Sequence, residues 1–131
     1  MKNNQNRGPS QRQLRVGEQL RHIIADTLRR GHLHDERLLG MAEKLTVSEV
    51  RATPDLKQAT AYISVLGGAD DKIMHDILEA LNEDAPLFQK EINAQSNLKF
   101  TPRVRFRHDD TIENVQKLEG ILSNLKYSEQ E

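Results

Sequence analysis

The sequence predicts a single α+β domain in which helices cover one face of a small three-stranded mixed sheet. Two kinds of apolar periodicity support this class. Some stretches alternate apolar and polar residues, as strands do, and others place apolar residues three or four positions apart, as helices do. The two kinds are interleaved in the order α-β-β-α-α-β-α, which favours helices packed on a sheet. With 131 residues, 36% of them hydrophobic, the chain can bury one modest core.

The first helix is expected to follow a polar, basic stretch over residues 1–9. Ser10 and Gln13 match the S-x-x-Q capping box, which marks a helix N-terminus. The apolar stripe of this helix consists of Val16, Leu20, Ile23, Ile24, Thr27 and Leu28. Gly31 is a suitable residue for its C-terminus. Residues 32–44 show no clear period and are predicted to form a loop with at most a short turn.

Residues 45–68 predict an antiparallel β-hairpin. The second of its two runs has Ala59, Ala61, Ile63 and Val65 on one face, and Gly67–Gly68 ends that run. The first run, residues 45–52, is rich in Val and Thr, but Glu49 interrupts the apolar phase. This interruption predicts a β-bulge near Glu49. Between the two runs, the Pro54–Asp55 pair is typical of a turn.

A second and a third helix are expected after the hairpin, separated by a break. Asp70 and Asp71 suit a helix N-terminus because they cap its free N–H groups and interact favourably with its dipole. The second stripe consists of Ile73, Met74, Ile77, Leu78 and Leu81. Pro86 disfavours helical geometry at Ala85, yet proline is well tolerated in a first helical turn. The third helix is therefore expected to begin there, with Leu87, Phe88 and Ile92 on its apolar side.

Residues 98–108 predict a third strand with one apolar face and one cationic face. The apolar face consists of Leu98, Phe100, Pro102, Val104 and Phe106, and the cationic face consists of Lys99, Arg103, Arg105 and Arg107. On this pattern both phenylalanines belong to the core, and Pro102 indicates an edge strand or a bulge. A final helix is expected over residues 112–125, capped by Asp109, Asp110 or Thr111.

Composition limits the functions that the chain can have. It contains no cysteine, which excludes disulfides, thiolate metal sites and a thiol nucleophile. No apolar run reaches the roughly 18 residues of a membrane helix, and the N-terminus lacks the apolar segment of a secretory signal. We therefore expect a cytoplasmic protein that does not bind membranes. The net charge of −1 conceals basic and acidic segments, and the acidic second helix should face either solvent or a basic protein.

Only two patterns in the sequence point to an enzyme or a metal-binding protein, and both are weak. His32, His34 and Asp35 could suggest a metal site, and the run from His108 to Asp110 could suggest a metal-dependent hydrolase. Neither has further ligands at motif spacing, and acids at a helix start are usually structural. No known catalytic or phosphate-cradling motif is present. We expect no catalytic activity, no cofactor and no bound metal.

Taken together, these segments resemble the bacterial ribosome-binding factor A family of small-subunit assembly factors, over roughly residues 12–125. The resemblance is carried by Arg15-Val-Gly-Glu-Gln-Leu20, Asp35-Glu-Arg-Leu38, Leu45-Thr-Val-Ser-Glu-Val-Arg-Ala-Thr-Pro-Asp-Leu56, Ala59 to Gly67, Phe100-Thr-Pro102 and Asp109-Asp-Thr-Ile-Glu113. It implies a KH-like fold of type II topology with a helix-kink-helix. Relatives commonly have Ala-x-Gly at the kink, whereas this chain has Asp84-Ala85-Pro86.

The polar composition of both ends, together with the resemblance, implies a division of the chain, and the resemblance also implies a function. Residues 1–9 would be a flexible basic tail, 10–126 the KH-like RNA-binding domain, and 127–131 a polar tail. A monomer would bind free or immature 30S subunits and 16S rRNA. It would support late assembly, 16S rRNA 5′-end processing and growth in the cold, with assembly GTPases or ribosomal proteins as further partners. The alternative is a general KH-like RNA-binding protein with other RNA clients.

The candidate rRNA-binding residues are the basic ones that the pattern places on exposed surfaces. They are Arg12, Arg15, Lys90, Lys99, Arg103, Arg105 and Arg107. Each could neutralise a phosphate and add to affinity and salt sensitivity, and each could equally be a solvated surface residue. Aromatic residues give little support for base recognition, because Phe100 and Phe106 are assigned to the core and the face that Tyr62 occupies is uncertain.

Overall fold

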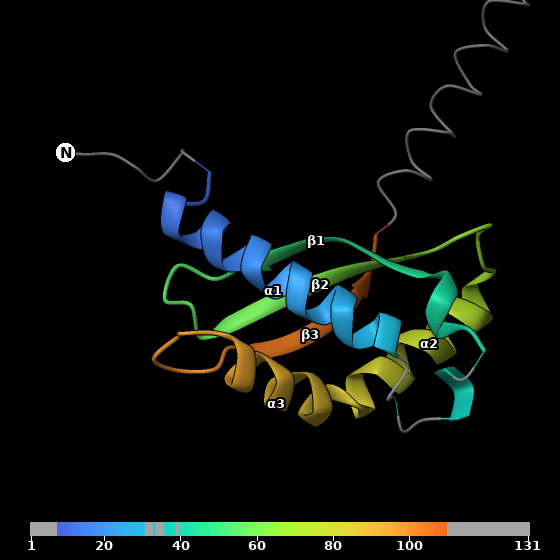
Figure 1. The fold of residues 1–131 in the computed structure, drawn as a ribbon. Coiled ribbons are helices and arrows are strands. Elements are labelled where there is room, and N and C mark those ends of the chain that lie inside the picture. Colours follow the sequence, from blue (N-terminus) through green and yellow to red (C-terminus); the bar gives the residue numbers. More distant parts are fainter. Residues whose placement is uncertain (1–7, 31–32, 34–35, 39, 110–131) are drawn as a thin grey trace, which may run out of the picture.

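The computed structural model describes residues 8–30, 33, 36–38 and 40–109, and this part of the chain forms an α+β fold (Figure 1). Its elements, in chain order, are α1 (Gln11–Arg30), the short 3₁₀ helices η2 (Glu36–Leu38) and η3 (Ala42–Lys44), β1 (Leu45–Ala52), β2 (Gln58–Val65), α2 (Asp71–Glu83), α3 (Ala85–Gln95) and β3 (Arg103–His108). The predicted class and order are confirmed over this range. The tail at residues 1–7, Gly31, and the final helix and tail after residue 109 lie outside the described residues.

The sheet is mixed, with the strand order β1-β2-β3. β1 and β2 form the predicted antiparallel hairpin, and β3 pairs parallel to β2. The register shifts between Val47 and Glu49, so Ser48 is an extra residue opposite β2. This bulge places Ser48 and Glu49 both on the exposed face and returns Val50 to the buried face. The predicted bulge is thus confirmed, and it explains how a glutamate fits in this strand.

The described helices lie on the same side of the sheet and enclose the core with it (Figure 1). Leu20, Ile24, Ile63, Leu81 and Phe88 are among the largest fully buried side chains. The rings of Phe88 and Phe106 meet at 4.8 Å with a tilted geometry, which joins α3 to β3.

The start of α1 and the break between α2 and α3 follow the predicted chemistry. Ser10 and Gln13 exchange the two bonds of a capping box, at 2.9 and 3.1 Å. The carboxylate of Asp70 accepts a bond from the backbone N–H of Ile73 and caps α2. α3 begins at Ala85, directly after Asp84, with Pro86 in its first turn. A proline there breaks the path of the chain without costing a helical hydrogen bond.

The third strand is shorter than predicted, and the assignment of Phe100 to the core is wrong. β3 begins at Arg103, whose N–H bonds the carbonyl of Lys57. β2 begins at Gln58, so residues before Arg103 have no strand to pair with. Phe100 therefore lies in the preceding loop and is 68% exposed, with the Lys99 ammonium 5.6 Å from its ring centroid.

The remaining differences are small. Ile73, predicted on the apolar stripe of α2, is 44% exposed. The expected loop over residues 32–44 contains the two 3₁₀ turns η2 and η3. No described helix is long and apolar enough to cross a membrane. Over the described residues there is also no group of three or more His, Cys, Asp or Glu residues that could hold a metal ion, and His32, His34, Asp35 and Asp110 lie outside that range.

Candidate nucleic-acid interface

β3 presents a row of three arginines on one face of the sheet. Arg103, Arg105 and Arg107 are exposed, while Val104 and Phe106 between them are buried at 8% and 2% exposure. Alternate residues of a strand point to opposite faces, and the rise of about 3.3 Å per residue puts neighbouring arginines about 7 Å apart. None of the three forms an ion pair with any residue in the described part of the chain. They are therefore available for external anions.

Two side-chain amides hold β3 in place along its outer edge. The backbone N–H of Phe106 donates to Asn82 Oδ1 at 2.9 Å, and Asn82 Nδ2 donates to the carbonyl of Phe106 at 3.3 Å. The N–H of Val104 donates to Gln89 Oε1 at 2.8 Å. Asn82 belongs to α2 and Gln89 to α3, so hydrogen bonds from both helices hold the backbone of the strand that carries the arginine row. Sequence analysis did not identify this role, because nothing in the spacing of a helical amide indicates a bond to a distant strand.

A groove of about 640 Å³ between α3 and β3 brings together two of the predicted site residues. Lys90 and Arg103 both line it, one from each element. The other lining residues are Ala85, Pro86, Gln89, Asn93, Thr101 and Val104. The groove therefore has a cation on each wall, and none of its lining residues in the described part of the chain is acidic. It begins at the break between α2 and α3. Such a groove suits a phosphate backbone.

The other predicted site residues lie apart from this groove. Lys99 is exposed in the loop before β3 and lies over Phe100. Arg12 and Arg15 are exposed on the first turns of α1, which packs on β1 and α3. Neither is among the residues that line the α3–β3 groove. The structure thus groups Lys90 with the β3 arginines and does not join Arg12 and Arg15 to them.

Several other arginines are engaged with carboxylates. Arg21 forms a two-pronged contact with Glu18 at 2.6 and 3.0 Å, and this hydrogen bonding lowers the pKa of Glu18. Asp26 pairs with Arg29 and Arg30. The acids of α2 are partly balanced in the same way, because Arg37 bridges Glu79 and Glu83. These ion pairs contribute little net positive charge to the surface. The unpaired arginine row on β3 is therefore the main source of positive charge in its part of the described surface.

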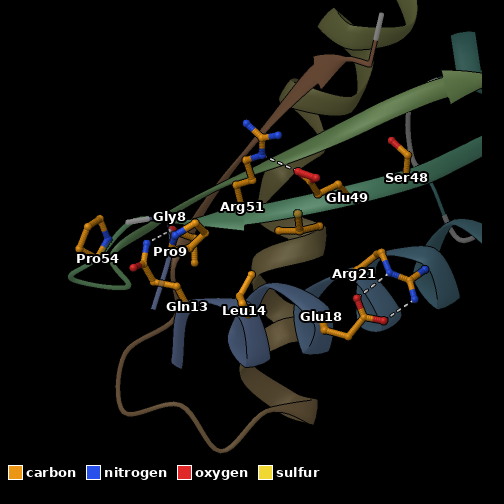
Figure 2. A pocket seen from close by; sticks show the side chains of 12 residues that line it. Gly8, Pro9, Gln13, Leu14, Glu18, Arg21, Ser48, Glu49, Arg51 and Pro54 are labelled. Atoms are coloured by element: carbon orange, nitrogen blue, oxygen red, sulfur yellow. Dashed lines mark hydrogen bonds and ion pairs between the residues drawn. The ribbon is translucent and has the colours of Figure 1, made fainter. Parts of the chain in front are cut away.

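A second groove, of about 710 Å³, lies between α1 and β1 (Figure 2). It is less suited to RNA. Its two arginines, Arg21 and Arg51, are bonded to Glu18 and Glu49, and the hydrogen bond to Glu49 raises the pKa of Arg51. Leu14, which is 56% exposed, forms part of its wall. Because both arginines are already paired, the described residues of this groove offer no free positive charge to a phosphate.

Comparison with known proteins shows which family this chain resembles. The family model described as ribosome-binding factor A matches residues 12–122. A ribosome-binding factor A of Methylobacterium sp. (strain 4-46) is 44% identical over 119 residues, which cover 91% of this chain and 82% of the relative. That of Bradyrhizobium sp. (strain BTAi1) is 46% identical over 115 residues, covering 88% of this chain and 80% of the relative.

Solved structures share the fold at lower identity. The crystal structure of ribosome-binding factor A from Thermus thermophilus superposes with a TM-score of 0.58 and 20% identity, covering 73% of this chain and 94% of that one. A Thermus thermophilus homology model, fitted into a cryo-EM map of a complex of that factor with the 30S subunit, gives a TM-score of 0.53 and 18% identity, covering 72% of this chain and 91% of that one. From the match of the family model and the identity to the curated relatives, we conclude that this chain belongs to the ribosome-binding factor A family.

Proposed function

We propose that this protein binds the 30S ribosomal subunit or its precursors, and that it does so by contacting 16S rRNA phosphates with β3 and the α3–β3 groove. The observation that carries the proposal is the row of Arg103, Arg105 and Arg107, unpaired within the described residues and continuous with Lys90 across the groove. Family membership supplies the client, since a factor of this family has been placed in a 30S complex. Phosphate contacts supply affinity without recognition of particular nucleobases.

Its role follows from holding rRNA rather than from reacting with it. By neutralising phosphates on a rigid strand, the protein stabilises one rRNA conformation during late assembly, and is then released. The same family resemblance implies support for 16S rRNA 5′-end processing and for assembly at low temperature, where RNA misfolds are slow to resolve. The protein works in the cytoplasm, where subunits are assembled.

Co-sedimentation with purified ribosomal particles over a series of salt concentrations tests this proposal. The test variant reverses two charges of the row, Arg103→Glu with Arg105→Glu. The control variant makes the same change in net charge elsewhere, with Arg29→Glu and Lys72→Glu, both exposed. We expect the test variant to bind 30S more weakly and to reduce the slope of log K against log salt by about 1.4 to 1.8, since each lost phosphate contact removes about 0.7 to 0.9.

Three outcomes count against the proposal. If both variants lose affinity equally, the row has no special position and only net charge matters. If neither loses affinity, the contact lies elsewhere on the molecule. If the wild-type protein pellets equally with 70S ribosomes and with free 30S subunits, or with neither, an assembly role is wrong and a general RNA-binding protein with other clients becomes the better description.

A further inference from the structure

The face of the sheet opposite the helices is open in the described part of the chain, and it is polar rather than apolar. The side chains on it are Thr46, Ser48, Glu49, Arg51, Gln58, Thr60, Tyr62, Ser64, Arg103, Arg105 and Arg107. No aliphatic side chain is among them. An apolar protein partner would find little to bury here. A nucleic acid would find one aromatic ring and an excess of cations over acids, because four arginines stand against Glu49 and against Asp109, whose carboxylate bonds Ser48.

That ring belongs to Tyr62, which lies on the middle strand. In the sheet register Glu49 is its partner on β1 and Arg107 is its partner on β3. The guanidinium of Arg51 lies over the Tyr62 ring, with its central carbon 5.3 Å from the ring centroid. Arg51 projects from β1 on the side away from α1 (Figure 2), and its side chain is 68% exposed.

The position of Arg51 is held from two sides. Glu49 bonds the Arg51 Nε from the neighbouring bulge position, and the Tyr62 ring supports the guanidinium from below. A carboxylate hydrogen bond and a cation–π contact together fix the orientation of an otherwise long and mobile side chain. The result is an exposed guanidinium plane held in one position, and bases stack on guanidinium planes as they do on aromatic rings.

We propose that Arg51 and Tyr62 form a stacking platform for one unpaired base of single-stranded RNA, with the neighbouring phosphates of the same strand held by the β3 arginines. The two parts lie on one face of the sheet and are separated by two strand spacings, about 10 Å. This inference rests on the proposed function, because it assumes that β3 contacts RNA. It adds to that function a second contact on the same face of the sheet and a preference for unpaired over duplex RNA.

Fluorescence anisotropy with a fluorescein-labelled oligouridylate of about ten nucleotides tests the platform. Arg51→Lys keeps the charge but loses the plane, and Tyr62→Leu removes the ring. We expect each variant to bind about tenfold more weakly. Tyr62→Phe keeps the ring and should stay within about twofold of wild type. The control is Thr46→Val, an exposed substitution on the same face but at the end of the hairpin where Thr46 faces Ser64. It should have no effect.

An abasic oligonucleotide of the same length separates stacking from charge. Without bases to stack, wild type and Tyr62→Leu should bind this probe equally, whereas they differ on oligouridylate. Equal loss on both probes, or unchanged affinity for Arg51→Lys on oligouridylate, would overturn the platform. Arg51 is so exposed that its substitution by lysine should not unfold the protein. The proposed function fails differently: there the wild-type protein does not co-sediment with 30S, whereas a failed platform leaves wild type and both variants co-sedimenting equally.

Discussion

The contact between α1 and β1 gives a demanding prediction, because it depends on a single missing carbon atom. Gly17 lies on the buried side of α1, and a Cβ added to it would lie 2.4 Å from the carbonyl oxygen of Val50 and 3.4 Å from its carbonyl carbon. Ordinary contacts of a Cβ begin near 3.4 Å. The Gly17→Ala variant would therefore have to separate helix and strand by about 1 Å at this point, since the opposing atom is backbone and cannot rotate away.

Two opposing effects set the size of the change. Alanine in a helix interior is favoured over glycine by about 1 kcal/mol. Overpacking of a close-packed contact costs about 1 to 3 kcal/mol, and a rigid backbone neighbour puts this case near 3. The net loss in the free energy of unfolding should be about 2 kcal/mol, which for a chain of 131 residues lowers the Tm by about 7 °C. Packing therefore outweighs helix propensity.

Urea and thermal unfolding, followed by circular dichroism, measure this loss. The matched control is Gly8→Ala, because a Cβ at Gly8 meets nothing within 4 Å. We expect the control to unfold within about 0.5 kcal/mol of wild type. A Gly17→Ala protein that is as stable as wild type, or more stable by the propensity term, would show that α1 does not approach β1 this closely.

Two further predictions concern the core and the hairpin turn. Phe88→Ala should lower the free energy of unfolding in urea by about 3 to 5 kcal/mol, because Phe88 is fully buried against Phe106. Phe100→Ala should change it by no more than about 0.5 kcal/mol. A large loss for Phe100→Ala would show that Phe100 is part of the core. A hydrogen bond from the Thr53 hydroxyl lowers the pKa of Asp55. The stability due to this charge is thus present above the unfolded-state pKa of about 3.9 and is lost as the pH falls through the lower folded-state pKa. In thermal melts, the Tm of wild type should be higher than that of Asp55→Asn at about pH 6. This difference in Tm should disappear in acid, and a difference that does not change with pH would show that the charge of Asp55 is not its cause.

Local signals in the sequence were sufficient for most elements of the fold. Ser10 and Gln13 marked the start of α1, and Pro86 marked the start of α3, because caps and proline act within one turn of helix. The break in apolar phase at Glu49 located the bulge, since a bulge changes which face each later residue occupies. Each of these features depends on residues close together in the chain.

Features that depend on distant partners were not predictable in this way. The alternation of residues 98–106 continues unbroken through Phe100, yet the strand begins at Arg103 because β2 has no residue to pair with the earlier ones. The cationic face of β3 was predicted correctly for Arg103, Arg105 and Arg107, since it needs only the strand period. Lys99, predicted on the same face, lies in the preceding loop. Which face Tyr62 occupies could be known only from the sheet register. That Lys90 and Arg103 lie on opposite walls of one groove could be known only from the packing of α3 beside β3.

The bonds from Asn82 and Gln89 to β3 have a consequence for the behaviour of the protein in solution. β3 is an edge strand, and the free N–H and C=O groups of such a strand invite strands of other molecules to add to the sheet. Here Asn82 and Gln89 already occupy the N–H groups of Phe106 and Val104. A second molecule could extend the sheet at this edge only by displacing both amides. The helices thus protect the protein from edge-to-edge aggregation, while no described residue covers the arginine face beside that edge.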